Sequence, residues 1–97
     1  MPYRLDATDQ EFAALMRHAG TFAGKRVLEV GCGNGRLTRK YARLAAHVDA
    51  IDPDAAKIAK ALTHPHPIHT HYHTTALEAF TQPSPYPYDL VILSWSL

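Results

Sequence analysis

Residues 29–35 read Glu-Val-Gly-Cys-Gly-Asn-Gly and combine one acidic residue with three glycines. Positions without a side chain let the backbone turn sharply and approach a bound ligand closely. The run before the loop, residues 27–30, is typical of a short strand, and apolar residues at helical spacing predict a helix at 36–46. The first N–H groups of that helix would point at the loop and favour an anionic group such as a carboxylate. The stretch therefore predicts a ligand-binding loop between a strand and a helix.

A second acidic residue, Asp52, follows the first glycine by about 20 residues, at the end of the next strand-like run, residues 47–52. A carboxylate there can accept two hydrogen bonds from a ribose diol, as in nucleoside-binding sheets. Asp52 also precedes Pro53, so we expect it to cap a helix that has proline at its first position. The two roles are compatible because an N-cap uses one carboxylate oxygen.

The glycine spacing separates two kinds of cofactor. A dinucleotide fingerprint has the pattern G-x-G-x-x-G, whereas here the third glycine, Gly35, comes one position early and Arg36 follows it. With Glu29 two residues before Gly31, the loop instead resembles motif I of the class I S-adenosylmethionine-dependent methyltransferases. The resemblance extends over residues 25–97. It implies that the loop packs against the methionyl part of S-adenosylmethionine and that Glu29 lies near the amino group of that cofactor.

Three later segments also resemble motifs of this family. Asp52 corresponds to the acid that binds the ribose in motif II, and Pro53 to the residue that flanks the adenine. The stretch 74–77, Thr-Thr-Ala-Leu, lies where the family often has a Gly-Asp pair followed by adenine contacts. Thr75 stands in place of that aspartate, which predicts a weaker contact than a charge-assisted one. The last ten residues, Tyr-Asp-Leu-Val-Ile-Leu-Ser-Trp-Ser-Leu, resemble motif IV, which places Ser94 beside the methyl-transfer centre.

The resemblance thus predicts a cofactor site made of eleven residues. They are Glu29, Gly31, Cys32, Gly33, Gly35, Asp52, Pro53, Thr75, Ala76, Leu77 and Ser94. Among them, Cys32 is expected to be a small structural residue rather than a nucleophile, because no histidine is implied beside it. No general base is predicted, and the catalytic residues are unassigned.

The elements that position these residues alternate between strands and helices. The pattern predicts, in chain order, a strand at 27–30, a helix at 36–46, a strand at 47–52, a helix from Pro53 to about Leu62, a strand at 68–75, a helical turn at 75–80 and a strand at 88–93. This order implies parallel strands joined by right-handed crossovers, and thus an α/β fold with a Rossmann-like open sheet and helices on both faces. The sheet of the family has seven strands, so the resemblance implies the first four of them.

The start of the chain predicts a separate segment. Thr8 and Glu11 have the spacing of a capping box and predict a helix at 9–19. Residues 1–24 are therefore expected to form an N-terminal helix or lid segment before a cofactor-binding domain at 25–97.

The apolar run at 90–93 is typical of a parallel strand buried on both faces, yet only four residues follow it. In the family this fourth strand lies in the middle of the sheet, so the resemblance implies that its partner on the other side is missing. An uncovered apolar edge promotes association. We therefore expect a fragment, the cofactor-binding half of a methyltransferase, that can associate through this strand.

Five of the seven histidines lie between residues 64 and 73. On a strand, His69, His71 and His73 would share one face, and alternating histidines occur as metal ligands. The same stretch corresponds to the third strand of the family, at the sheet edge, where polar side chains discourage pairing between sheets. We therefore expect no metal site.

The composition limits the remaining function classes. The 97 residues make one domain at most, and their net charge of +1 comes without a basic stripe, which argues against nucleic-acid and anionic-membrane binding. No run approaches the roughly 18 apolar residues of a membrane span, and the first residues lack a signal-peptide pattern, so a cytoplasmic protein is expected. The single cysteine excludes an internal disulfide and a zinc site of several thiolates.

Together these features predict an S-adenosylmethionine-dependent methyltransferase that acts on a small-molecule acceptor by in-line transfer of the sulfonium methyl group. Two other classes are open from the sequence. A nicotinamide-dependent oxidoreductase shares the sheet and the ribose acid, although the G-x-G-x-x-G fingerprint is missing. A non-catalytic cofactor-binding module is the other, because the chain is expected to be truncated.

Overall fold

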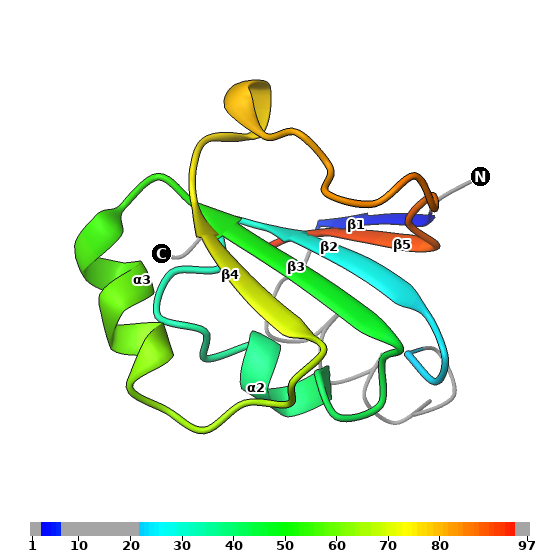
Figure 1. The fold of residues 1–97 in the computed structure, drawn as a ribbon, viewed down its shortest axis with the longest axis horizontal. Helices are drawn as coiled ribbons and strands as arrows, with labels where there is room; N and C mark the ends of the chain where they lie inside the picture. Colours follow the sequence, from blue (N-terminus) through cyan, green and yellow to red (C-terminus); the bar gives the residue numbers. More distant parts are fainter. Residues whose placement is uncertain (1–2, 7–21, 95–97) are drawn as a thin grey trace.

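The computed structural model describes residues 3–6 and 22–94, which form a parallel sheet with helices packed against it (Figure 1). The strands lie in the order β1-β5-β2-β3-β4, and every described pair is parallel. Their bounds are β1 Tyr3–Asp6, β2 Arg26–Val30, β3 His47–Asp52, β4 Thr70–Thr74 and β5 Leu90–Leu93. The α/β class and the four predicted strands are confirmed, while the helix predicted at 9–19 lies outside the described residues.

The sheet also contains a strand that the sequence did not predict. β1 pairs with β5 from Tyr3 opposite Leu90 to Asp6 opposite Leu93, and β2 pairs with the other edge of β5. The expectation that the last strand has an uncovered edge is therefore wrong, and association through that edge loses its basis. The physical reason is that a buried strand has backbone N–H and C=O groups on both edges, and β1 supplies the second set of partners.

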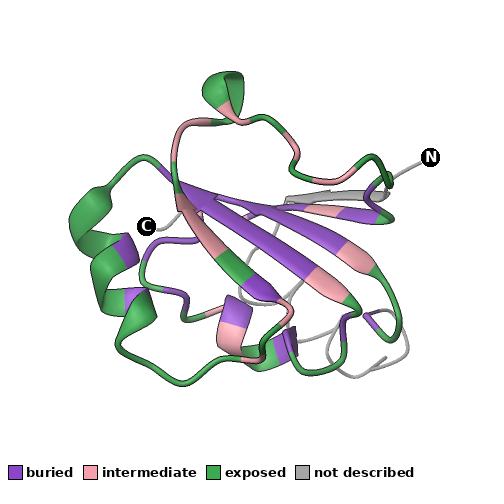
Figure 2. Ribbon diagram, viewed as in Figure 1, coloured by how far each residue is buried: buried purple, intermediate pink, exposed green. Residues whose placement is uncertain are grey.

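The two faces of the sheet are covered differently. One face packs against α2, Thr38–Tyr41, and α3, Ala55–Leu62 (Figure 1). The core on this face contains Phe22, Val27, Cys32, Tyr41, Ala42, Ala45, Val48, Ala50, Ile58, Leu90 and Ile92. The other face lies under the loop 75–88, which includes the 3-10 helix η2, Leu77–Ala79. Its smaller core contains Leu28, Val30, Ile51, Tyr88 and Leu93. Figure 2 shows β2 and β3 buried along most of their length and the outer side of α3 exposed.

α2 is much shorter than the helix expected at 36–46. Gly33 and Gly35 have positive φ angles of 57° and 81°, which are incompatible with a helix, so the chain reaches α2 only after a series of turns. Beyond α2, the Ala46 amide donates to the Lys25 carbonyl at 2.8 Å, and this directs the chain into β3. The predicted helix is therefore reduced to one turn, because the glycine loop takes the start of the segment and the return to the sheet takes its end.

α3 begins later than predicted. Its N-cap is Asp54, whose side chain accepts hydrogen bonds from the amides of Ala56 and Lys57. Asp52 is not the cap, because it is still paired in the sheet, opposite Thr74. The assignment of Asp52 as an N-cap is therefore wrong, and its side chain is left for the glycine loop.

The described helices are short. α3 has 8 residues, against the roughly 20 of a bilayer-spanning helix. None of the helices in the described parts of the chain is long and apolar enough to cross a membrane.

Candidate functional site

The carboxyl ends of β2 and β3 are tied together by Asp52. Its Oδ2 accepts a hydrogen bond from the Gly33 amide at 2.9 Å, and its Oδ1 accepts one from the Asp54 amide at 2.8 Å. The Gly31 amide donates to the carbonyl of Ile51 at 2.8 Å. The predicted ligand loop and the predicted ribose acid thus meet at one place on the sheet. Only 6% of Asp52 is exposed, but each carboxylate oxygen keeps a second lone pair for a ligand.

The backbone amides of the loop are used within the protein. The Gly35 amide donates to the Cys32 carbonyl at 3.0 Å. The Arg36 amide donates to the side-chain oxygen of Asn34 at 3.2 Å. α2 starts only at Thr38 and has a single turn. The expectation that a helix N-terminus points free amides at an anionic group is therefore wrong for these amides, because the loop bonds to itself and one turn carries little dipole.

The absent side chain at position 35 makes room for a tyrosine of β4. A Cβ atom on Gly35 would lie 2.6 Å from the Tyr72 hydroxyl oxygen, and the φ of 81° would strain any other residue. Arg39 supports the same loop, because its Nη1 donates to the Asn34 carbonyl at 2.7 Å. The space at Gly35 is thus filled by protein, and the sequence analysis predicted neither supporting contact.

Glu29 is fully buried between the sheet and α2. Its Oε1 accepts hydrogen bonds from Thr38 Oγ1 at 2.7 Å and from the Tyr41 hydroxyl at 2.6 Å. Its Oε2 lies 2.8 Å from Ser94 Oγ, which is also 2.9 Å from the Gly31 carbonyl oxygen. Burial raises the pKa of Glu29, and the three hydroxyls offset only part of this effect. Glu29 therefore joins β2, α2 and the end of β5, and its contact with the amino group of a cofactor stays a prediction.

The residues predicted to face the adenine follow the ends of β3 and β4. The Thr75 amide donates to the Asp52 carbonyl at 3.0 Å, which places the two strand ends side by side. The Thr75 hydroxyl donates to the Ala76 carbonyl, also at 3.0 Å. Pro53 is exposed, and Leu77 is 49% exposed. Apolar side chains thus follow the same strand ends as the carboxylate, which fits the flat base and the ribose diol of an adenosine.

The Cys32 side chain is buried behind the loop, and its Sγ lies 3.7 Å from the Gly33 carbonyl oxygen. Burial is the main cause that raises the pKa of this thiol, and the charges of Glu29 and Asp52 add to it. A protonated, buried thiol is a poor nucleophile, in agreement with the structural role expected for Cys32.

The histidine-rich stretch does not converge on one point. His69 precedes β4, and its Nε2 lies 2.7 Å from the Ala42 carbonyl oxygen on the helix-covered face. His71 is exposed, whereas His73 contacts the buried Asp49. The prediction of three histidines on one face is therefore wrong for His69, because it lies outside the strand. Within the described part of the chain, no three side chains of His, Cys, Asp or Glu are grouped so as to hold a metal ion.

A family model described as "Methyltransferase domain" matches residues 27–97, from β2 through β5. The chain belongs to the methyltransferase domain family. This membership agrees with the resemblance of the glycine loop to motif I, and it gives no support to a nicotinamide-dependent oxidoreductase.

Two curated relatives match the chain over part of their own length. The chain is 38% identical over 73 residues to a ubiquinone biosynthesis O-methyltransferase of Xylella fastidiosa strain M23, a match that covers 73% of the chain and 30% of the relative. It is 35% identical over 92 residues to a protein of the same description from Hahella chejuensis, covering 93% of the chain and 35% of the relative. The chain thus spans about a third of the length of the curated relatives it matches.

Solved methyltransferase structures also resemble the chain over part of their own length. A putative type II methyltransferase from Anaeromyxobacter dehalogenans is similar with a TM-score of 0.63 and 34% identity, covering 82% of this chain and 33% of the other. A magnesium protoporphyrin IX methyltransferase from Synechocystis PCC 6803, solved with bound S-adenosylhomocysteine, is similar with a TM-score of 0.64 and 25% identity. That match covers 88% of this chain and 39% of the other.

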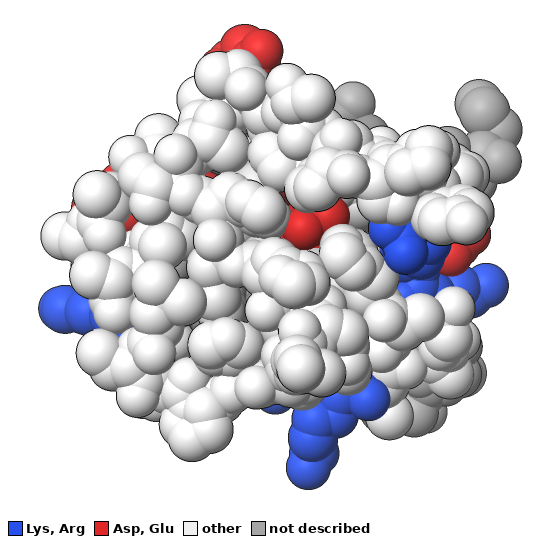
Figure 3. All heavy atoms as spheres, viewed as in Figure 1, with Lys and Arg blue, Asp and Glu red and all other residues white. Residues whose placement is uncertain are grey.

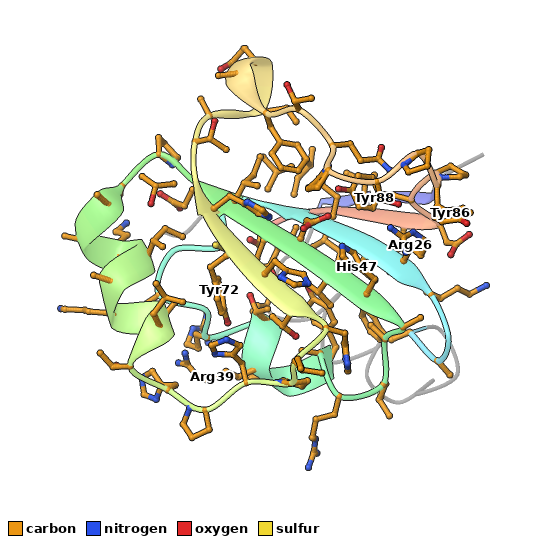
Figure 4. All side chains as sticks on the ribbon, viewed as in Figure 1. Arg26, Arg39, His47, Tyr72, Tyr86 and Tyr88 are labelled. Atoms are coloured by element: carbon orange, nitrogen blue, oxygen red, sulfur yellow. The ribbon has the colours of Figure 1, made fainter. Side chains whose placement is uncertain are left out.

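The methyltransferase domain also contains a buried polar cluster that the sequence analysis missed. Asp49 lies within β3 with no exposed surface, on the face under the loop 75–88. Its Oδ2 accepts a hydrogen bond from the Tyr88 hydroxyl at 2.6 Å and lies 2.8 Å from His47 Nε2. Its Oδ1 lies 2.8 Å from His73 Nε2. Figure 4 shows His47 and Tyr88 on this face, and we call these four side chains the Asp49 cluster.

The donors of the Asp49 cluster decide the charge of its carboxyl group. Burial alone would raise the pKa of Asp49, but the hydrogen bonds from Tyr88, His73 and His47 outweigh it and hold the pKa below its ordinary value of 3.8. The signal in the sequence was an aspartate inside an apolar strand-like run, where a charge is costly unless partners surround it.

Proposed function

We propose that this domain binds S-adenosylmethionine across the carboxyl ends of β2, β3 and β4 and serves in the transfer of its methyl group to a small-molecule acceptor. The observation that carries the proposal is the 2.9 Å hydrogen bond from the Gly33 amide to the Asp52 carboxylate. It holds an acid suited to a ribose diol directly against a glycine loop that a ligand can approach closely. Family membership and the protoporphyrin methyltransferase solved with S-adenosylhomocysteine support this choice of cofactor.

Different residues contact different parts of the cofactor. Asp52 accepts hydrogen bonds from the two ribose hydroxyls. Pro53 and residues 75–77 provide the surface for the adenine, and residues 31–33 lie along the methionyl part. Ser94, at the end of β5, marks the side of the site on which the methyl group is transferred.

The bound cofactor supplies an electrophilic methyl group on a sulfonium sulfur. The chain contributes placement, because holding the methyl group and its acceptor close and aligned is worth up to roughly 7–11 kcal/mol. Relatives of this chain are described as O-methyltransferases, which supports an oxygen atom as the one that receives the methyl group. A cytoplasmic location and the lack of a nucleic-acid partner stay predictions from the sequence.

Isothermal titration calorimetry of the 97-residue chain with S-adenosylhomocysteine tests the proposal. Asp52→Asn keeps the size of the side chain but removes a charge-assisted contact to the ribose, so we expect about a tenfold loss of affinity. Asp89→Asn is the matched control, because Asp89 lies at the opposite end of the sheet, where it accepts a hydrogen bond from the Arg26 amide. It should bind like the wild type.

Several results would contradict the proposal. One is the absence of binding by the wild-type chain, or equal affinity of wild type and Asp52→Asn once circular dichroism shows that both are folded. Another is tighter binding of NAD than of S-adenosylhomocysteine, which would indicate a dinucleotide-binding site instead.

A further inference from the structure

A concave surface lies on the helix-covered side of the sheet, beside β4. It is a groove of about 470 Å³ lined by Arg39, Ala42, Arg43, Tyr72 and residues 65–67, and we call it the α2 groove. α2 and the turn after it form one wall, and the loop between α3 and β4 forms the other. Small-molecule sites have volumes of roughly 300–1,000 Å³, so the α2 groove can hold a compact organic molecule.

The α2 groove is positively charged. Arg39 and Arg43 are four residues apart and both line it. Among the described residues, no carboxylate lines the groove, and none pairs with either arginine. Figure 3 agrees, since the part of the surface over α2 carries blue Lys or Arg side chains and no red ones. This charge favours an anion.

The rest of the α2 groove is mainly apolar and contains two aromatic rings. The rings of Tyr72 and His66 meet edge to face with their centroids 5.5 Å apart, and Pro65 and Pro67 flank the histidine. A planar apolar group can lie against these rings while an attached anion meets the guanidinium groups. A ligand that has both parts fits better than an inorganic anion.

Two side chains of the α2 groove also hold the glycine loop. Arg39 donates to the Asn34 carbonyl at 2.7 Å, and the Tyr72 hydroxyl occupies the space beside Gly35. Figure 4 shows Arg39 and Tyr72 between α2 and β4. The Arg39 guanidinium already donates to the glycine loop. A ligand that binds the same guanidinium therefore changes the hydrogen bond that Arg39 makes to the loop.

We propose that the α2 groove binds a small molecule that carries a carboxylate on a flat apolar body, and that its occupation is transmitted to the glycine loop. The planar guanidinium groups of Arg39 and Arg43 match the two oxygens of a carboxylate, and Tyr72 packs against the flat body. The effect on cofactor affinity rests on the proposed function, whereas binding in the groove does not.

NMR titration of the ¹⁵N-labelled chain with benzoate tests the binding. Benzamide is the neutral molecule of similar shape, and inorganic phosphate is the anion without a ring. We expect benzoate to shift the amide signals of His66 and Tyr72, and both other probes to bind about tenfold more weakly. Arg43→Gln should weaken benzoate by a similar factor, whereas Lys60→Gln, an exposed lysine of α3, should not.

Two results would overturn the binding site. Equal affinity of Arg43→Gln and Lys60→Gln for benzoate would place the ligand elsewhere. Phosphate binding as tight as benzoate binding would reduce the groove to a general cationic surface. Both variants replace exposed side chains, so their spectra should otherwise match the wild type.

The transmission to the loop has two readouts. Benzoate should shift the amide signals of Gly33 and Gly35 without any cofactor present, and it should change the affinity for S-adenosylhomocysteine by about fivefold. Unchanged glycine signals at saturating benzoate would overturn the transmission. A chain that binds benzoate and shifts these signals but does not bind S-adenosylhomocysteine would refute the proposed function and leave the groove in place.

Discussion

Two carboxylates are buried in adjacent strands of the sheet, but on opposite faces. Glu29 in β2 lies opposite Ala50 of β3, and Asp49 in β3 lies opposite Leu28 of β2. Neither has any exposed surface. Among the described residues, the donors to Glu29 on the face under α2 are three hydroxyls, whereas Asp49 meets two histidines and a tyrosine on the face under the loop 75–88.

The difference in donors gives the two acids opposite electrostatics. Burial dominates for Glu29 and raises its pKa, while the donors dominate for Asp49 and lower its pKa. Burial by itself therefore does not decide the charge of an acid in this sheet; the groups that the fold brings to it do. Their roles differ accordingly, because Glu29 is connected through Ser94 to the glycine loop, and Asp49 ties together strands and the loop above them.

The largest effect is expected from Asp49→Asn. The new amide group presents hydrogen atoms where His47, His73 or Tyr88 requires an acceptor, so buried donors lose their partner. We expect the free energy of unfolding to fall by about 3 kcal/mol, measured by urea denaturation. Asp89→Asn, an exposed aspartate, should cost less than about 0.5 kcal/mol. A cost for Asp49→Asn as small as that of the control would remove the contrast between the two acids.

The pH dependence should differ in sign. The pKa of Glu29 is raised in the folded state, so its contribution to stability is present below the ordinary value of 4.5 and is lost as the pH rises through the raised pKa. The pKa of Asp49 is lowered, so its contribution is present above the ordinary value of 3.8 and is lost as the pH falls through the lowered pKa.

Urea unfolding at a series of pH values from about 3 to about 7 measures both slopes, with Glu29→Gln and Asp49→Asn as references. The stability of the wild type relative to Glu29→Gln should fall with rising pH, by at most about 1.4 kcal/mol per pH unit. The stability of the wild type relative to Asp49→Asn should fall as the pH decreases below the ordinary value of 3.8. Slopes of the same sign would show that the two acids do not differ as described.

Tyr88→Phe should have a smaller effect than Asp49→Asn. It removes one of three donors to the carboxylate, and we expect a loss of about 1 kcal/mol of unfolding free energy in urea. Tyr86→Phe is the control, because Tyr86 is 64% exposed. If Tyr88→Phe cost as much as Asp49→Asn, the histidines would contribute nothing to holding Asp49.

The smallest effect is expected from Glu29→Gln. The amide oxygen can still accept from Thr38 and Tyr41, and the amide nitrogen can donate to Ser94 Oγ. At a pH below the ordinary value of 4.5, we expect a loss of about 0.5 kcal/mol in the same urea experiment. A loss as large as that of Asp49→Asn would mean that Glu29 is held as an anion, contrary to the raised pKa.

The strand ends were predicted well and the connections less well. The strands, the glycine loop and the position of Asp52 follow from local patterns, and the structure brings the loop and Asp52 together. The N-cap was misplaced because Asp52 and Asp54 both suit the role, and only the sheet pairing of Asp52 excludes it. β1 was missed because nothing in the few residues of 3–6 distinguishes a strand that exists only through its pairing with β5.

The supports of the site could not be predicted. In the sequence, Tyr72 lies between two histidines, and nothing there marks it as a support of the glycine loop. Its contact with Gly35 joins residues that are far apart in the chain. The same holds for the Asp49 cluster, in which a residue in a strand-like run meets donors from later segments.

What the sequence by itself determined was the α/β order, the glycine loop and the acid that follows it, because periodicity and turn-forming residues act over a few neighbouring positions. Only the tertiary structure decided which groups surround the two buried acids. Ser94 is 65 positions from Glu29, and Tyr88 is 39 positions from Asp49. Contacts over such separations form when strands pair and loops close over them. The same packing buries both acids: burial raises the pKa of Glu29 despite its hydroxyl donors, whereas the hydrogen bonds to Asp49 outweigh burial and lower its pKa.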